Sequence, residues 1–321
     1  MLRVLLVKTS SLGDVVHNLP VATDVRRHFP DATIDWVVEE PFVALARMHP
    51  AVRRVIPVAV RRWRSQVLGP STWKELAEFQ RLSQAELYDA IIDTQGLLKS
   101  TLIARAARGR RHGFDVGSAR EPLAARFYDL KHHVARGQHA VVRNRLLAAA
   151  ALGYRIDTPA DFGLRASAGA SEAVPASGRR RCAILHGSSR PDKLWPVDSW
   201  IVLGGRLDAA GIDCVLPWGS DAERARSEAI AAAVPGAVVP GRMTLDEVAG
   251  LLASSAMVVG VDTGITHLAG ALGRPVVALF LASDPALTGV YGAPRARNLG
   301  HIGAPATPDD VVDALSALQA L

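Results

Sequence analysis

Short apolar runs rich in β-branched residues alternate with helix-like segments along this chain. The strands expected in the first half cover residues 2–7, 33–39, 53–58 and 88–94. Helices are expected over about 15–28 and 97–107. Strands that alternate with helices predict a parallel sheet with helices on both of its faces.

The same alternation begins again after residue 178. Residues 166–178 (ASAGASEAVPASG) are small, contain Pro and Gly, and have no periodicity, which is typical of a linker. The strands expected after it cover residues 181–186, 212–218, 257–262 and 275–281. The helices expected there cover residues 197–210, 222–233, 245–253, 264–272 and 308–320. The sequence therefore predicts an α/β protein of two Rossmann-like domains, with ligands outside the carboxyl ends of the strands and the active site in the cleft between the domains.

Several classes of protein are excluded by missing signatures. No GxGxxG segment follows a predicted strand, which lowers the odds of an NAD or FAD enzyme, and no GxxxxGK[ST] loop occurs. The absence of an Asp-x-Asp pair argues against a nucleotide-sugar site bridged by a metal. The two cysteines, Cys182 and Cys214, form no CxxC motif and fit a reducing compartment. No apolar run reaches the roughly 18 residues of a membrane helix.

The positive charge of the chain lies in its first half. Residues 1–158 carry 24 Lys and Arg against 15 Asp and Glu, whereas residues 159–321 carry 13 against 16. The net charge of +6 therefore combines +9 with −3. A basic half indicates an anionic partner, namely nucleic acid, a membrane surface, or a phosphorylated or carboxylated substrate, unless the charge serves only solubility.

Polar residues follow the first predicted strand in the segment 8–17 (KTSSLGDVVH). Small residues let the backbone approach a ligand closely, and a helix that begins here can bind negative charge at its N-terminus. Asp14 lies near that N-terminus, where a carboxylate often caps the helix. Asp14 is a candidate either for a structural cap or for a general base.

A second polar segment, residues 259–267 (VGVDTGITH), ends a buried strand and begins a helix. The backbone N–H groups of Thr263 and Gly264 would face an anion such as a phosphate. Asp262 and His267 are candidates for the same site. The structural alternatives are a helix cap for Asp262 and a core histidine for His267.

A third segment, residues 186–196 (HGSSRPDKLWP), follows the first strand of the second half. The hydroxyls of Ser188 and Ser189 and the cation of Lys193 suit phosphate oxygens. Each of these segments alone could be an ordinary polar loop. Three of them, all at the carboxyl ends of predicted strands, indicate a binding site.

The basic residues are concentrated in residues 41–74, which contain seven Lys or Arg and no Asp or Glu. Arg61, Arg62 and Arg64 form the densest group. Arginine clusters bind carboxylates and phosphates through paired hydrogen bonds. Few aromatic residues accompany these cations and no RNA-binding motif occurs, so a nucleic-acid partner is not expected. A zinc site made of His132, His133 and His139 has little support from their spacing.

These motifs together resemble the lipopolysaccharide heptosyltransferases, most closely those that add the first heptose. The resemblance extends to about residue 300, and the motifs occur in the same order. The segments that carry it are KTSSLGDVVH (8–17), DWVVEE (35–40), IPVAVRRWR (56–64), SAREP (118–122), KHHV (131–134) and VDTGITH (261–267).

The resemblance implies the two-domain glycosyltransferase B fold. It implies an acceptor domain over residues 1–165 and a donor domain over residues 175–307, with a C-terminal helix at about 308–321 that packs back on the acceptor domain. The donor would be ADP-L-glycero-β-D-manno-heptose, and the acceptor would be Kdo-lipid A. Transfer would invert the anomeric centre without a metal or other cofactor.

The resemblance also implies roles for single residues. Asp14 matches the catalytic base of the family. The donor-site residues fall on Ser188, Ser189, Lys193, Glu223, Met243, Asp262, Thr263, Gly264 and His267. The acceptor-site residues fall on Ser11, Gly13, Arg61, Arg62, Arg64, Arg120 and Arg143. The family's Thr-Thr pair is here Ser188-Ser189, which keeps the hydroxyls and loses a methyl contact. The enzyme would be cytoplasmic and would make transient contact with the inner face of the inner membrane.

Alternatives stay open at this point. The chain could be a heptosyltransferase that adds a later heptose of the core, or a sugar-nucleotide epimerase of the same fold. From a different class, it could be a module that binds an anionic polymer or an anionic membrane. That module would explain the basic half and would leave the phosphate-binding segments of the second half without a use.

Overall fold

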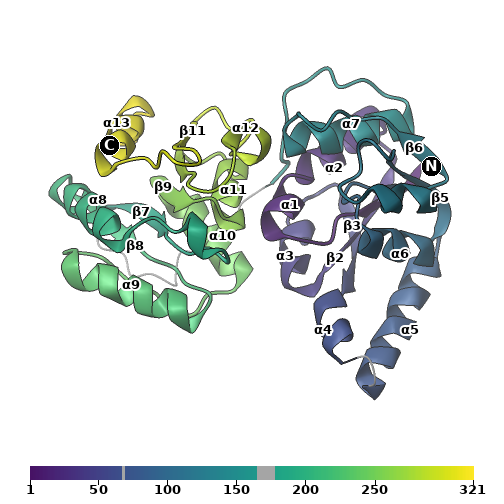
Figure 1. The fold of residues 1–321 in the computed structure, drawn as a ribbon, viewed down its shortest axis with the longest axis horizontal. Helices are drawn as coiled ribbons and strands as arrows, with labels where there is room; N and C mark the ends of the chain where they lie inside the picture. Colours follow the sequence, from purple (N-terminus) through teal and green to yellow (C-terminus); the bar gives the residue numbers. More distant parts are fainter. Residues whose placement is uncertain (67–68, 165–177) are drawn as a thin grey trace. The chain divides into compact units, whose positions relative to one another are not determined.

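The computed structural model describes residues 1–66, 69–164 and 178–321. The chain divides into two compact units, Met1–Leu164 and Arg165–Leu321. Each unit is a parallel sheet with helices packed against it, as the sequence predicts (Figure 1). The predicted linker at 166–178 lies outside the described residues except for Gly178.

The first unit contains six parallel strands in the order β3-β2-β1-β4-β5-β6. They are β1 (Arg3–Val7), β2 (Thr33–Glu39), β3 (Val52–Val58), β4 (Leu87–Asp93), β5 (Arg108–Phe114) and β6 (Leu130–His132). The four strands expected from the sequence are confirmed to within one residue at each end. β5 (RGRRHGF) and β6 (LKH) were not predicted, because both are polar strands at one side of the sheet and lack an apolar run.

Helices cover the first sheet on both faces. The expected helix over 15–28 is two helices, α1 (Leu12–Val16) and α2 (Leu19–His28), and α2 packs on α7 (Ala140–Leu152). On another part of the sheet, Phe79 of α5 (Pro70–Gln84) and Ile103 of α6 (Leu98–Ala106) share a core with apolar residues of β1–β4. The shorter helices are α3 (Val43–Arg47) and α4 (Val60–Ser65), with 3-10 turns at Glu40–Phe42 and Pro122–Phe127.

The second unit contains five parallel strands in the order β11-β10-β9-β7-β8. They are β7 (Arg180–Leu185), β8 (Ile212–Val215), β9 (Met257–Val261), β10 (Val276–Leu279) and β11 (Ala296–Leu299). A parallel bridge from Val215 to Val238 extends the sheet beyond β8. The helices are α8 (Val197–Ala209), α9 (Asp221–Ala233), α10 (Leu245–Ser254), α11 (Gly264–Ala271), α12 (Pro285–Thr288) and α13 (Pro308–Ala317).

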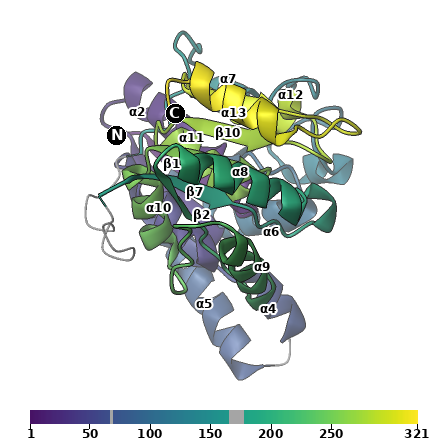
Figure 2. The same cartoon turned by 90° about the vertical axis from the view of Figure 1, so that its left-hand side faces the viewer.

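The C-terminal helix contributes apolar side chains to the core of the second unit, and its expected packing on the first unit stays a prediction. Val311, Ala314 and Leu315 of α13 join the apolar cluster that contains Trp200 and Leu203 of α8. Figure 2 shows α13 beside α8. The physical reason is the apolar face of α13, which the strands and α8 of its own unit bury.

Both sheets reverse their strand order at a defined point. In the first unit β2 and β4 lie on opposite sides of β1, and in the second unit β8 and β9 lie on opposite sides of β7. The connections leave in opposite directions there, so a crevice opens at the carboxyl ends of the two central strands. The fold therefore points to the segments after β1, β4, β7 and β9 as places for a ligand.

Two adjacent glycines of α8 provide a test of this packing. A Cβ on buried Gly204 would lie 2.7 Å from Val234, whereas a Cβ on exposed Gly205 would meet no atom within 4 Å. We expect Gly204→Ala to lower the free energy of unfolding by roughly 1–3 kcal/mol through overpacking. Gly205→Ala should raise it by up to about 1 kcal/mol, because alanine favours a helix. Chemical denaturation of both variants measures this difference, and equal effects would contradict the packing of α8 on Val234.

Candidate functional site

The carboxyl end of β9 gathers four polar side chains in the second unit. Asp262 follows the strand directly, and its Oδ2 atom accepts a hydrogen bond from Lys193 Nζ at 2.5 Å and another from the Ser283 hydroxyl. Its Oδ1 atom lies 3.2 Å from His267 Nε2. Three segments, after β9, after β7 and after β10, therefore meet at one carboxylate.

The hydrogen bonds to Asp262 keep its carboxylate ionised. Burial alone would raise the pKa of Asp262, but hydrogen bonds from His267, Lys193 and Ser283 outweigh burial and hold the pKa well below its ordinary value. The Lys193 ammonium, 17% exposed at its side chain, is thereby fixed at the end of the strand. A buried carboxylate of this kind orients the cation beside it.

The N-terminus of α11 lies in the same place. Thr263 is the N-cap residue in extended conformation, and within the described residues no side chain caps the helix. The first N–H groups of α11 are therefore available to an anion. The backbone of β9 lies close to α11, because a Cβ on Gly260 would lie 2.2 Å from the Thr266 hydroxyl. That hydroxyl donates a hydrogen bond to the Val261 carbonyl.

The segment after β7 lies against the N-terminal turn of α9. A Cβ on Gly187 would lie 2.5 Å from Oε1 of Glu223, so the Glu223 side chain packs on the backbone of this segment. Oε2 of Glu223 accepts a hydrogen bond from the Gly219 N–H at 2.8 Å. Ser188 is partly exposed and Ser189 is exposed. The structure thus brings Glu223 to Gly187, the residue before the serine pair.

Met243 has a different environment from the other predicted donor residues. It is partly buried and packs against Val215 and Leu251. This contact places Met243 beside β8 and α10, near the N-cap residue Thr244.

Asp14 of the first unit caps its own helix. Its Oδ2 atom accepts hydrogen bonds from the Ser11 N–H at 2.8 Å and from the Ser11 hydroxyl at 3.2 Å. The capping role considered from the sequence is therefore present, and the side chain remains partly exposed. Gly13 lies in the same turn, between the two partners.

A buried lysine lies beneath this turn. Lys8 is 6% exposed, and its ammonium donates to the Thr94 carbonyl at 2.9 Å. Burial lowers the pKa of Lys8, and the negative charges of Asp14 and Asp93 partly offset that effect. The positive charges of Arg120 and Arg143 act on Lys8 in the opposite sense. These side chains therefore form one electrostatic cluster at the carboxyl end of β1.

The segment after β4 is hydrogen-bonded to the loop after β1. Oε1 of Gln95 accepts from the Thr9 N–H at 2.8 Å. Asp93, fully buried, accepts from the Gln95 N–H at 2.9 Å and from the Tyr128 hydroxyl at 2.8 Å. Gln95 and Asp93 were not among the residues predicted from the sequence. The signal for them was the polar run DTQG at the end of the strand over 88–94.

The predicted acceptor arginines have unequal environments. Arg143 stacks over the Phe114 ring at 4.9 Å and donates to the Ser118 carbonyl at 2.6 Å. Arg120, two residues further along from Ser118, is exposed. Arg143 is thus anchored by the protein, whereas the exposed guanidinium of Arg120 can reach a ligand.

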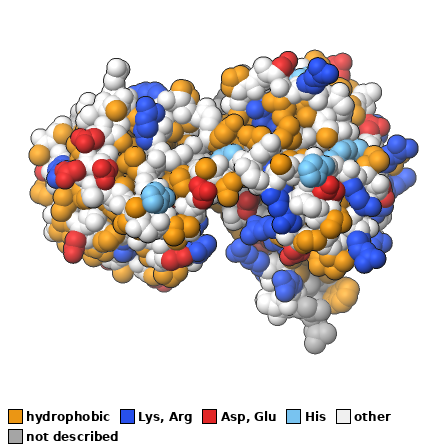
Figure 3. Space-filling view, turned by 45° about the horizontal axis from the view of Figure 1, so that its top comes forward, with side chains coloured by type: hydrophobic (Ala, Val, Ile, Leu, Met, Phe, Trp, Pro, Cys, Tyr) orange, Lys and Arg blue, Asp and Glu red, His pale blue; other side chains and the backbone are white. Residues whose placement is uncertain are grey.

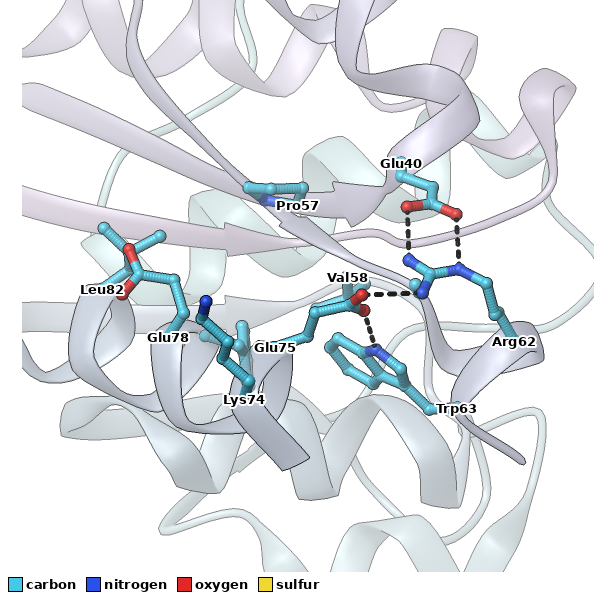
Figure 4. A pocket seen from close by; sticks show the side chains of 11 residues that line it. Glu40, Pro57, Val58, Arg62, Trp63, Lys74, Glu75, Glu78 and Leu82 are labelled. Carbon is cyan, nitrogen blue, oxygen red and sulfur yellow. Dashed lines mark hydrogen bonds and ion pairs between the residues drawn. The ribbon is translucent and has the colours of Figure 1, made fainter. Parts of the chain in front are cut away.

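Arg62 is bound on both sides by carboxylates. It pairs with Glu40 at 2.9 Å and with Glu75 at 2.8 Å, and Glu75 also accepts from the Trp63 indole at 2.7 Å (Figure 4). These bonds fasten α4 to α5. Arg61 and Arg64, on the same short helix, are exposed. Of the three arginines, Arg62 is the one with a structural partner on each side.

Other basic residues of the segment 41–74 serve the fold. Arg53 and Arg54 each lie 2.8 Å from the buried Asp35 carboxylate, which also accepts from the Tyr88 hydroxyl at 2.7 Å. On the face in Figure 3, Lys and Arg side chains gather on the first unit, at the right of the view. The excess positive charge of the first half is thus partly structural and partly displayed at the surface.

Among the described residues, no group of three or more His, Cys, Asp or Glu side chains is arranged to hold a metal ion. Within the same residues, no helix has the length and apolar character to cross a membrane.

The sequence model of glycosyltransferase family 9 (heptosyltransferase) matches residues 76–313. The chain is also 44% identical over 293 residues to lipopolysaccharide heptosyltransferase 1 of Escherichia coli strain K12, and the match covers 91% of each protein.

Solved structures give the same result. The E. coli heptosyltransferase WaaC with ADP superposes with a TM-score of 0.90 at 40% identity, covering 99% of this chain and 100% of that one. The same enzyme with ADP-2-deoxy-2-fluoro heptose gives a TM-score of 0.87 at 40% identity, covering 98% of this chain and 99% of that one.

The buried histidine after β7 makes stability depend on pH. Burial, aided by Arg226, lowers the pKa of His186 to about 4. The unfolded chain binds a proton near its ordinary pKa of 6.5 while the folded chain does not, so stability is full above pH 6.5 and falls as the pH drops toward 4. We expect His186→Gln to reduce this loss by up to about 1.4 kcal/mol per pH unit. Urea denaturation at pH 5, 6 and 7 measures it, and an unchanged slope would contradict a neutral His186.

Proposed function

Because this chain belongs to glycosyltransferase family 9, the heptosyltransferases, we propose that it transfers L-glycero-D-manno-heptose from ADP-heptose to the Kdo of Kdo-lipid A. The product would carry the first heptose of the lipopolysaccharide inner core. The observation that carries the proposal is the meeting of Lys193, His267 and Ser283 at Asp262, beside the uncapped N-terminus of α11.

The second unit would bind the donor. The N–H groups of Thr263 and Gly264 and the Lys193 ammonium suit the pyrophosphate of ADP-heptose. Glu223, packed against Gly187, has a carboxylate that suits the ribose hydroxyls. The hydroxyls of Ser188 and Ser189 would add hydrogen bonds to phosphate. The E. coli structures with ADP and with a fluorinated ADP-heptose support this assignment by similarity.

The same groups would stabilise the leaving group. As the bond from the anomeric carbon to the ADP oxygen breaks, negative charge develops on that oxygen. A cation fixed in advance and a helix N-terminus lower the energy of that charge without reorganisation. Lys193, oriented by Asp262, would supply the cation. This scheme uses no bound metal or other cofactor.

The first unit would bind the acceptor and deprotonate it. Exposed Arg61, Arg64 and Arg120 suit the carboxylates and phosphates of Kdo-lipid A. Asp14, oriented by Ser11, would take the proton of a Kdo hydroxyl. The oxygen of that hydroxyl would attack the anomeric carbon on the face opposite ADP. The anomeric configuration is inverted, ADP departs with the bonding electrons, and Asp14 releases its proton to water.

A lipid-linked acceptor would bring the enzyme to a membrane. We place the protein in the cytoplasm, in transient contact with the inner face of the inner membrane. The positive charge of the first unit supports attraction to anionic lipids. Nucleic acid is not part of the proposal.

A transfer assay with ADP-heptose and Kdo-lipid A tests the reaction, with product mass as the readout. We expect one added heptose, with undiminished activity in EDTA. Transfer only to an acceptor that already carries heptose would assign the enzyme to a later step of the core. Folded protein that transfers to neither acceptor and still binds heparin would favour a binding module instead.

Replacement of Asp14 tests the general base. We expect Asp14→Asn to lower kcat by about 10²–10⁴-fold, because a general base contributes that much, while affinity for ADP-heptose is unchanged. Asp31→Asn is the matched control, since it makes the same change at an exposed aspartate before β2. Full activity in a folded Asp14→Asn variant would show that Asp14 serves only as the helix cap.

Replacement of Lys193 tests the pyrophosphate assignment. We expect Lys193→Gln to weaken ADP-heptose binding by about tenfold or more, because a charge-assisted hydrogen bond contributes roughly 1.5–3 kcal/mol. Isothermal titration calorimetry with ADP-heptose measures the affinity. Arg206→Gln, which removes an exposed cation paired with Asp309, is the control. Equal affinities of the two variants would contradict the role of Lys193.

A further inference from the structure

An apolar groove lies on the first unit, between α4, α5 and α6. Its volume is about 1020 Å³. Apolar side chains from all three helices line it, among them Trp63, Trp73, Leu76, Leu98 and Leu102. Figures 1 and 2 both show α4 and α5 projecting from the sheet.

The apolar groups of this groove reach the surface. Trp73 is 60% exposed and Leu102 is 62% exposed, although both are large and apolar. Monomeric proteins rarely expose adjoining apolar side chains over a wide area, and such a patch marks an interaction surface. Tryptophan in particular is favoured where an apolar phase meets water.

Cations accompany these apolar side chains. Arg64, Lys99 and Arg105 line the groove, against a single carboxylate, Glu121. The Glu121 carboxylate accepts a hydrogen bond from the Leu98 N–H at 2.6 Å, at the start of α6. Arg64 and Arg105 are exposed, so their positive charge complements an anionic partner. An apolar face joined to cations is the combination by which proteins lie on anionic bilayers.

The groove is connected to the loop that precedes Asp14. The Lys99 ammonium, at its edge, donates to the Ser10 hydroxyl at 2.9 Å. Trp63 lines the groove and is held by Glu75, which also holds Arg62. A surface bound here would therefore lie close to the residues assigned to the acceptor.

We propose that the groove between α4, α5 and α6 docks the enzyme on an anionic phospholipid bilayer, with Trp73 and Leu102 entering the interface and the exposed Arg64 and Arg105 facing lipid phosphates. This inference rests on the proposed function, because an acceptor anchored in a membrane must be reached there. Docking at this groove brings the Asp14 loop to the height of the lipid headgroups.

Vesicle binding tests the docking surface directly. The double variant Trp73→Glu, Leu102→Glu places negative charge at two exposed positions. We expect its partitioning onto vesicles of phosphatidylglycerol and phosphatidylethanolamine to fall by about tenfold or more in flotation assays. Val202→Glu is the control, because it makes the same change at an exposed apolar residue of α8 in the second unit and should bind like wild type. Equal binding of the double variant and wild type would overturn the proposal.

Transfer assays separate this proposal from the proposed function. With a deacylated, water-soluble Kdo acceptor, the double variant should match wild type, whereas transfer to acceptor embedded in vesicles should fall. Wild type that transfers to neither acceptor would refute the proposed function instead.

Two further results would assign the groove to another occupant and overturn the proposal. One is unchanged vesicle binding with loss of transfer to acylated acceptor in detergent, which would place an acyl chain of the acceptor in the groove. The other is a dimer of the wild-type protein that becomes a monomer in the double variant, which would place a second copy of the chain in the groove.

Discussion

Parallel pairing of the strands is the constraint on which the rest of this structure depends. It sends every strand's carboxyl end to the same edge of its sheet, so the segments after neighbouring strands must meet. Gln95, after β4, accepts a hydrogen bond from the N–H of Thr9, after β1. After β7, β9 and β10, Lys193 and Ser283 meet at Asp262. In both units, the polar groups collect where the strand order reverses.

Collecting charged groups at the end of a buried strand has an energetic cost, and each unit offsets it with partners. Burial opposes the ionised form of Asp262, and three hydrogen-bond donors outweigh that effect. The cost of burying the Lys8 ammonium is offset less fully, because burial lowers the pKa of Lys8 despite the negative charges of Asp14 and Asp93. Charges that are fixed in this way are oriented before a ligand arrives, which is the condition for electrostatic catalysis.

Residues within one local motif could be predicted from the sequence, and contacts made across the sheet could not. Asp262, Thr263 and Gly264 follow one strand, so the strand pattern alone indicated them. Ser283 follows β10, and nothing in its own surroundings marks it as a partner of Asp262. The basic segment shows the same limit, because the sequence does not distinguish Arg62, paired with Glu40 and Glu75, from the exposed Arg61 and Arg64.

By itself, the sequence determined the two α/β units, the central strands of both sheets and the polar segments at their ends, because hydrophobic periodicity and strand-end polarity are local properties. The tertiary structure alone decided which side chains meet. It added the polar strands β5 and β6, buried α13 against α8 of its own unit, and packed Glu223 on Gly187. The reason is physical: contacts between residues far apart in the chain depend on strand order and register, which no local pattern encodes.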